Sequence, residues 1–360
     1  MKELEKWEGL SAERLSAAVE PLSAWYRENR RSLPWRDEPT PYHVWLSEVM
    51  LQQTRIAAVI PYYHRFLTAL PTVNALASVE DGALMKLWEG LGYYSRARNL
   101  KAAAKRIVED FGGELPADYK ALLSLPGIGE YTAGAIASIA FGLPEPAVDG
   151  NVLRVMARLC DFHADVALPE TKKQVTEALR RVYPAGDGAG ILTQAIMELG
   201  ENVCIPNGQP RCIECPLSPY CAALAANTVD ELPKKTPKKP RRIEQKTVLL
   251  MEHEGAYALR KRPEGGLLAG LWEFPIAEGI LDAEAVTALL REWGGEAEAC
   301  DPIGNAVHVF THVEWHMTGY RVRCKVPPRH AILATAEELS NRYAIPRAFS
   351  YFVKHCLAKK

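Results

Sequence analysis

Apolar residues recur at three- and four-residue spacing through the first part of the chain, from residue 11 to about residue 227. Leu84, Leu87, Trp88 and Leu91 show this period, which is that of an amphipathic helix. Leu-Pro and Gly-Leu-Pro sequences interrupt the pattern repeatedly, as the ends of helices do. The pattern therefore predicts an all-helical first domain.

A second pattern begins after this helical part. Residues 247–251 and 256–260 have the character of two strands and flank a Glu-Gly turn. Residues 306–310 and 320–326 have the same character, and a helical stretch at about 282–293 lies between the two pairs. We expect an α+β second domain.

A basic segment separates the two patterns. Between Lys234 and Lys246 there are seven basic residues, one acidic residue and two prolines. This composition is typical of a solvated linker, and a linker that also contacts phosphates is the alternative. We place the two domains at residues 1–227 and 247–360, with the linker at 228–246.

Composition narrows the class of protein. A length of 360 residues, 48% hydrophobic and 24% charged, fits two ordinary globular domains. No apolar run approaches the ~20 residues that cross a bilayer, and the segment 1–10, with three glutamates, is no secretory signal. We expect the cytoplasm, where thiols stay reduced. The net charge of −1 does not favour a nucleic-acid partner, although a local basic face matters more than the sum.

Four of the eight cysteines lie within eighteen residues and are separated by seven, two and five residues: Cys204, Cys212, Cys215 and Cys221. Four thiolates suit either structural zinc or a [4Fe–4S] cluster. Only one Cys-x2-Cys pair is present, whereas a zinc ribbon usually has two, so the spacing favours the iron–sulfur cluster. The other four cysteines are expected to be small buried apolar residues.

A glycine-containing turn precedes a predicted helix at 131–140. In Leu125-Pro-Gly-Ile-Gly129, the glycines permit a tight turn and expose backbone N–H groups that can hold a phosphate. Asp149 follows twenty residues later. Together with the cysteine loop, these features resemble the helix-hairpin-helix DNA glycosylases of the endonuclease III and MutY type. That family usually has six residues between the first two cysteines, where this chain has seven.

Three further segments, at 31–36, 45–54 and 90–98, resemble the MutY branch. The resemblance implies that Glu48 is the catalytic acid and Asp149 the catalytic carboxylate, with Tyr131 and Asn151 orienting Asp149. It also implies a larger set of residues that contact the substrate or the DNA: Arg31, Leu33, Trp35 and Gln194 around the adenine, and Gln53, Thr54, Leu91, Tyr93, Gly127 and Gly129 on the duplex.

The position of Tyr131 separates this chain from the bifunctional relatives. Those enzymes carry a lysine there, whose amine attacks the sugar as a Schiff-base nucleophile. With tyrosine at this position, efficient strand cleavage is not expected. The implied chemistry is instead that of a glycosidase, with Glu48 protonating adenine N7 and an ionised Asp149 stabilising the oxocarbenium-like sugar.

The C-terminal part resembles the Nudix-like domain that ends MutY proteins, through residues 260–263 and 266–275. The helix near 291–295 lacks the glutamate array that would hold magnesium, so no pyrophosphohydrolase activity is expected. Residues Phe310, Thr311 and His312 match the family's lesion-recognition loop, in which serine is often the middle residue. A plain β-turn after a strand is the alternative.

The sequence thus predicts a helix-hairpin-helix glycosylase domain with an iron–sulfur loop, followed by a Nudix-like α+β domain. We expect a monomeric, monofunctional, bacterial enzyme with one [4Fe–4S] cluster, which releases adenine opposite 8-oxoguanine or guanine in double-stranded DNA. The alternatives are a Nudix hydrolase fused to a DNA-binding module, an endonuclease III-like lyase and a non-enzymatic iron–sulfur regulator. The missing glutamate array argues against the Nudix hydrolase, and Tyr131 argues against the lyase. The presence of both Glu48 and Asp149 argues against a non-enzymatic regulator.

Overall fold

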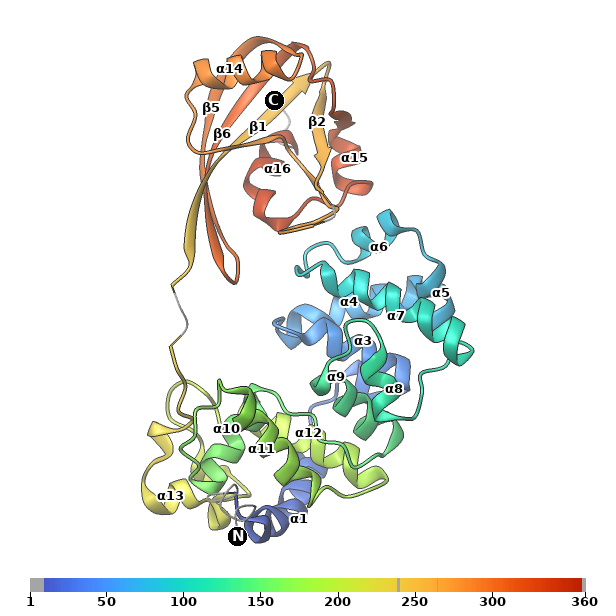
Figure 1. Ribbon diagram of the computed structural model, residues 1–360, viewed down its shortest axis with the longest axis vertical. Coiled ribbons are helices and arrows are strands. Elements are labelled where there is room, and N and C mark those ends of the chain that lie inside the picture. Colours follow the sequence, from blue (N-terminus) through green and yellow to red (C-terminus); the bar gives the residue numbers. More distant parts are fainter. Residues whose placement is uncertain (1–9, 238–239, 264, 358–360) are drawn as a thin grey trace. The chain divides into compact units, whose positions relative to one another are not determined.

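The computed structural model describes residues 10–237, 240–263 and 265–357 (Figure 1). Part of the predicted basic linker, residues 238–239, and most of the N-terminal segment considered above lie outside these ranges. Contacts divide the chain into two compact units, one of residues 1–78 with 99–237 and one of residues 79–98 with 238–360. In the described part of the chain, no helix is both long and apolar enough to span a membrane.

The first unit is helical, as predicted. Its helices are α1 (Ala12–Asn29), α2 (Pro34–Asp37), α3 (Pro41–Leu51), α4 (Ile56–Ala69), α5 (Val73–Ser78), most of α7 (Ser95–Phe111), α8 (Tyr119–Ser124), α9 (Glu130–Ala135), α10 (Gly150–Cys160), α11 (Pro169–Arg180), α12 (Asp187–Asn202) and α13 (Ala222–Ala226). Short 3₁₀ turns lie on either side of α13, at η3 (Cys212–Glu214), η4 (Ser218–Tyr220) and η5 (Val229–Glu231).

One core of the first unit packs α1, α10, α11 and α12 together. Leu22 of α1, Met156 of α10, Val175 of α11 and Ile196 of α12 are all buried in it. Because these side chains come from four helices, their burial fixes α10 and α12 against each other. These two helices carry Asn151 and Gln194.

The predicted hairpin joins α8 to α9. Gly127 has a φ of 75°, and a Cβ atom there would lie 2.5 Å from the Cβ of Asn99, so both the backbone and the packing require glycine. The helix after the hairpin was predicted to run to Ala140, and it does so with a change of type. Helix α9 continues as a π-helical turn, η2 (Ile136–Ala140).

The second unit is a seven-stranded mixed sheet with helices, which confirms the α+β prediction. The strand order is β3-β2-β1-β6-β5, with β4 paired to β1 and β7 paired to β2. The elements are α6 (Asp81–Leu87), β1 (Arg242–His253), β2 (Ala256–Lys261), β3 (Trp272–Glu273), β4 (Ile276–Glu278), α14 (Ala283–Glu292), β5 (Glu296–Val309), β6 (Val313–Val326), β7 (Ile332–Thr335), α15 (Ala336–Asn341), η6 (Arg347–Phe349) and α16 (Ser350–Leu357).

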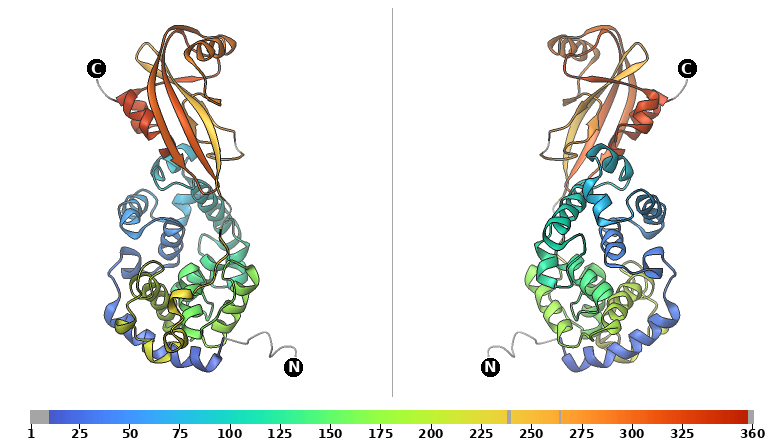
Figure 2. Two further views of the ribbon diagram at one scale, coloured as in Figure 1. Left: turned by 90° about the vertical axis from the view of Figure 1, so that its left-hand side faces the viewer. Right: turned by 90° about the vertical axis from the view of Figure 1, so that its right-hand side faces the viewer.

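Strand β1 is buried on both faces of this sheet. Val248 and Leu250 pack in a core with Phe352 of α16, whereas Leu249 and Met251 pack in a separate core with side chains of α14. Figure 2 shows these two helices on opposite sides of the sheet. Successive side chains of a strand alternate between faces, so two covered faces explain the continuous apolar run at 247–251.

The predicted strands fall within β1, β2, β5 and β6, except that Phe310 lies just after the end of β5. Glu254 and Gly255, with φ values of 49° and 79°, form the predicted turn between β1 and β2. Strand β5 begins ten residues earlier than the predicted strand at 306–310, and the hairpin from β5 to β6 turns at residues 310–312. The candidate lesion loop is therefore the tip of a hairpin.

Candidate active site

A pocket of about 280 Å³ lies in the first unit, between α2, α3, α9, α10 and α12. It brings together nine residues that the sequence singled out: Arg31, Leu33, Trp35, Glu48, Thr54, Tyr131, Asp149, Asn151 and Gln194. These positions are spread over more than 160 residues of chain, so their convergence on one hollow depends on the fold of the whole unit.

Glu48 lies on α3 and is 7% exposed. The Tyr131 hydroxyl donates a hydrogen bond to its Oε2 over 2.6 Å. Burial raises the pKa of Glu48 to about 7, with a further increase from the charge of Asp149, while the Tyr131 hydrogen bond and Arg36 oppose the rise. A carboxylic acid with this pKa can hold a proton near neutral pH and release it to a substrate.

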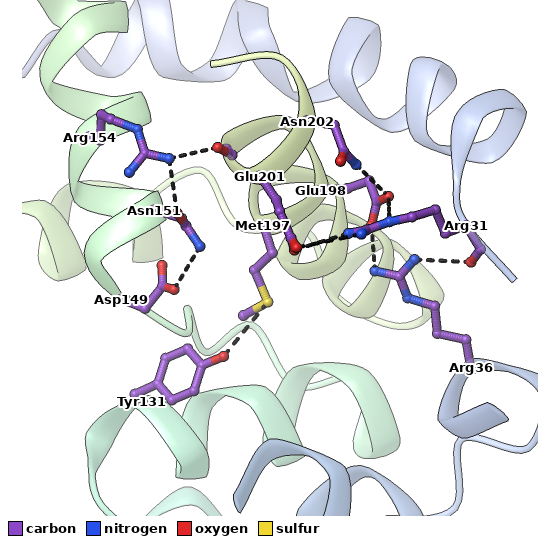
Figure 3. Close-up of polar contacts among 11 residues, drawn as sticks. Arg31, Arg36, Tyr131, Asp149, Asn151, Arg154, Met197, Glu198, Glu201 and Asn202 are labelled. Atoms are coloured by element: carbon purple, nitrogen blue, oxygen red, sulfur yellow. Dashed lines mark hydrogen bonds and ion pairs between the residues drawn. The ribbon is translucent and has the colours of Figure 1, made fainter. Parts of the chain in front are cut away.

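Asp149 is the N-cap of α10. Its Oδ1 accepts from the backbone N–H of Val152 over 2.8 Å, and its Oδ2 accepts from Nδ2 of Asn151 over 3.2 Å (Figure 3). Burial raises the pKa of Asp149, and these hydrogen bonds act in the opposite direction. Tyr131 was expected to orient Asp149, but its hydroxyl donates to Glu48 instead.

Asn151 is held in turn by Arg154, which is 5% exposed. Nη2 of Arg154 donates to Oδ1 of Asn151 over 2.9 Å and to the carbonyl oxygen of Gly200 over 2.6 Å. Its Nε donates to the carbonyl oxygen of Cys204 over 2.8 Å. The amide that contacts Asp149 is therefore fixed through α10 to the start of the cysteine loop.

Two charged residues of α12 that the sequence did not single out complete one wall of the pocket. Glu198 accepts from both Arg31 and Arg36, and Glu201 accepts from Nη2 of Arg31 over 3.0 Å (Figure 3). Glu198 follows Gln194 by four residues, and residues at this spacing share one helix face. That spacing was the only signal in the sequence for its position.

The four clustered cysteines line a second, smaller hollow of about 30 Å³, together with Arg158. All four are free thiols, and Nη1 of Arg158 donates to Sγ of Cys204 over 3.4 Å. Within the described ranges, no three His, Cys, Asp or Glu side chains are grouped as a site for a metal ion. Four cysteine sulfurs are a donor set that suits either zinc or an iron–sulfur cluster.

Gln53 and Tyr93, expected to contact the duplex, have the same unusual backbone. Their φ values are 57° and 46°, in the left-handed region that non-glycine residues rarely adopt. Tyr93 belongs to the second unit, as does Leu91, which is buried, whereas the Tyr93 side chain is 45% exposed. Such strained positions cluster at sites that bind ligands.

The hairpin tip at 310–312 is held by several contacts within the second unit. The Tyr93 and Thr311 hydroxyls are hydrogen-bonded over 2.8 Å, and the Phe310 ring lies edge-on against Trp315, with centroids 5.0 Å apart. Nε of Arg241 donates to the carbonyl oxygen of Phe310 over 3.1 Å, and the Arg242 N–H donates to that of His312 over 3.2 Å. Arg241, just before β1, and Arg242, at its start, therefore hold the first and last residues of the loop.

Comparisons with known proteins agree with this architecture. Residues 46–185 match the HhH-GPD superfamily of base excision DNA repair proteins, and residues 247–355 match the NUDIX domain. The adenine DNA glycosylase of Mus musculus is 37% identical, over 81% of this chain and 68% of the mouse protein. That of Buchnera aphidicola subsp. Acyrthosiphon pisum is 31% identical, over 83% of this chain and 84% of that protein. The chain belongs to the adenine DNA glycosylase family.

Members of the adenine DNA glycosylase family differ in length. The human adenine DNA glycosylase is 38% identical to this chain, which spans 64% of the human protein. Among solved structures, a thermostable thymine-DNA glycosylase has a TM-score of 0.53 at 25% identity, over 59% of this chain and 98% of its own. An endonuclease III–DNA complex, with a TM-score of 0.51 at 24% identity over 60% of this chain and 98% of its own, shares the fold.

Proposed function

We propose that this member of the adenine DNA glycosylase family hydrolyses the N-glycosidic bond of adenine paired with 8-oxoguanine or guanine in duplex DNA. The observation that carries the proposal is the pair of carboxyl groups, Glu48 and Asp149, in one buried pocket with different hydrogen-bond partners. Two carboxyls in different surroundings can divide the roles of acid and anion, as in glycosidases.

Glu48 is the general acid of this proposal. Adenine leaves poorly as an anion, so a proton delivered to N7 lowers the barrier. The raised pKa of Glu48, about 7, keeps this proton available, and the Tyr131 hydrogen bond fixes the carboxyl in one orientation. A duplex base has to leave the stack before it can enter such a pocket.

Asp149 is the anion that faces the sugar. Departure of the base leaves an oxocarbenium-like centre, which an ionised carboxylate stabilises or traps before water completes the hydrolysis to an abasic site. The Val152 N–H and the Asn151 amide both donate to the Asp149 carboxylate, and such bonds favour its charged form.

We further propose that the enzyme has no efficient lyase activity. Schiff-base formation needs a primary amine at the sugar, and none of the residues that line the described pocket is a lysine. The side chain in the corresponding place, Tyr131, donates a hydrogen bond to Glu48.

These two proposals predict one outcome on a duplex with a single 8-oxoguanine:adenine pair. Under single-turnover conditions the adenine strand should stay intact on a denaturing gel, and alkali should then cleave it at the abasic site. Borohydride should trap little covalent adduct. Strand cleavage without alkali, together with efficient trapping, would contradict the proposal that the enzyme has no efficient lyase activity. A strand that stays intact after alkali would contradict the proposed release of adenine.

The hairpin tip in the second unit is our candidate for the lesion reader. Thr311 offers a hydroxyl at the tip, already hydrogen-bonded to Tyr93, and the Arg241 and Arg242 contacts hold the loop's two carbonyls. The second unit carries no catalytic role in this proposal, because its helix α14 lacks the glutamate array of Nudix hydrolases. We propose the limits 1–227 and 247–360 as divisions of the sequence. In the structure, strand β1 of the second unit already begins at Arg242, and residues 79–98 group with that unit.

Thr311→Ala should lower the preference for 8-oxoguanine:adenine over guanine:adenine several-fold, because one hydrogen bond contributes about 1 kcal/mol. His312→Ala should act in the same direction. Thr311→Ser is the matched control and should keep the preference, since it retains the hydroxyl. The measurement is the ratio of single-turnover rates and of affinities on the two mispairs. An unchanged ratio in Thr311→Ala would remove the loop from lesion recognition.

We propose that Cys204, Cys212, Cys215 and Cys221 hold one [4Fe–4S] cluster. They line one hollow, and the Arg158 guanidinium beside Cys204 offers a positive charge to a group of thiolate-bound irons. The bound group would supply a covalent cross-link across the loop. No catalytic step is assigned to it. We also propose that the enzyme acts on DNA as a monomer in a reducing cytoplasm.

A further inference from the structure

Glu198 has more charged partners than a single buried carboxylate needs. Its side chain is 1% exposed, and it accepts from Arg31 Nη2 over 3.1 Å, from Arg36 Nη2 over 2.8 Å and from Asn202 Nδ2 over 2.8 Å (Figure 3). The pKa of Glu198 stays low although burial acts to raise it, because the two arginines outweigh burial. Glu198 is therefore an anion that neutralises guanidinium charge inside the pocket wall.

Charged side chains of both signs line the pocket around Glu48. Besides Glu48 and the Tyr131 hydroxyl, the charged side chains lining the pocket are three arginines and three carboxylates: Arg31, Arg36, Arg55, Asp149, Glu198 and Glu201. The formal charges around Glu48 thus cancel. Arg36 stabilises the ionised form of Glu48, and Glu198 is bound directly to that arginine. Removal of the Glu198 charge would leave the pocket with one excess positive charge.

We propose that Glu198 is a positioning residue for adenine release, which holds Arg31 and Arg36 and offsets their charge so that Glu48 keeps the proton needed by the leaving base. This inference rests on the proposed function, because it assigns a task to Glu48. In this proposal, α12 both forms a wall of the adenine pocket and, through Glu198, helps to keep Glu48 protonated.

The test is the pH dependence of single-turnover adenine release by full-length Glu198→Gln. An uncompensated cation near an acid lowers its pKa, so the alkaline limb of the profile should move down by on the order of one pH unit. At a pH above the limb the rate should therefore be about tenfold lower than wild type, whereas at low pH the two rates should converge. Glu201→Gln is the matched control. Its side chain is 47% exposed and is paired with Arg31, so its shift should be smaller.

Arg36→Gln and the double variant Arg36→Gln/Glu198→Gln complete the design. Arg36→Gln removes a cation and should move the limb upward, and the double variant should return it toward the wild-type position. Arg36→Gln also tests the proposal if Glu198→Gln does not fold. An equal loss of rate at every pH, or a limb that none of these variants moves, would overturn the charge-offset role.

A second readout does not depend on turnover. The ¹³C NMR titration of the glutamate side-chain carboxyls, with the Glu48 signal assigned by its loss in Glu48→Gln, should show a lower pKa for Glu48 in Glu198→Gln. Absence of adenine release by the wild-type protein would contradict the proposed function alone. An unchanged Glu48 titration in Glu198→Gln would contradict this inference alone.

Discussion

Glu48→Gln and Asp149→Asn should each lower the single-turnover rate of adenine release by about 10²- to 10⁴-fold, the range that a general acid or a positioned charge contributes. Glutamine cannot protonate N7, and asparagine cannot balance the positive charge that develops on the sugar. Neither group lies in the hairpin proposed to hold a phosphate, so affinity for the mismatched duplex should change little. A substantial residual rate in Asp149→Asn would show that another group stabilises the sugar.

The pH dependence of adenine release by the wild-type protein tests which carboxyl acts protonated and which acts ionised. In the proposed mechanism Glu48 is the acid, and its pKa is about 7, so the rate should fall as the pH rises through that value. The proposed role of Asp149 needs its ionised form, and burial raises its pKa, so the rate should also fall at the acid end as that carboxylate gains a proton. Glu48→Gln should abolish the alkaline limb. Asp149→Asn should keep this limb but move it to lower pH, because the charge of Asp149 raises the pKa of Glu48.

Protein purified without oxygen should be brown and hold about four irons per chain. Cys215→Ser should lose most of this iron and should lower the midpoint of thermal unfolding, because the loop 204–221 loses its cross-link. Cys300→Ser is the control, since Cys300 lies in the second unit, outside the loop, and should keep full iron content. Stoichiometric zinc without iron would contradict the cluster.

Two measurements that do not depend on catalysis separate the loss of iron from a loss of the fold. Arg154 links the carbonyl of Cys204 to the Asn151 amide, so the circular dichroism of the helical unit and duplex binding should both be measured on Cys215→Ser. If the variant keeps its fold, its affinity and its iron, the cysteine loop holds the group by other ligands.

Local sequence was sufficient to predict those elements whose residues show both a burial pattern and a characteristic turn. The apolar run at 247–251 predicted a strand because both faces of β1 are covered, and Glu254 with Gly255 predicted the turn that follows. The first half of β5 was missed. The missed residues, 296–305, interrupt their apolar positions with three acidic residues, Pro302 and Gly304. Strand β5 is also the edge strand of the sheet, where one side of the backbone has no partner strand.

The pocket residues were predictable where they lie in short motifs, as Glu48, Tyr131 and Asp149 do. Glu198 was not, because a glutamate on an amphipathic helix is usually solvated and nothing near it in sequence marks its burial. Its two arginine partners lie more than 160 residues earlier in the chain. The Tyr131 to Glu48 hydrogen bond was missed for the same reason, since its geometry depends on how α9 packs beside α3.

The left-handed backbone at Gln53 and Tyr93 has a consequence for engineering. A non-glycine residue in this conformation costs the folded state about 1 kcal/mol relative to glycine, which adopts it freely. A stability screen of the free protein would count this backbone cost against both side chains, and at Tyr93 it would weigh that cost against the hydrogen bond to Thr311. A glycine variant would also lose the side chain expected to contact the duplex, a loss that selection for repair detects and a stability screen does not.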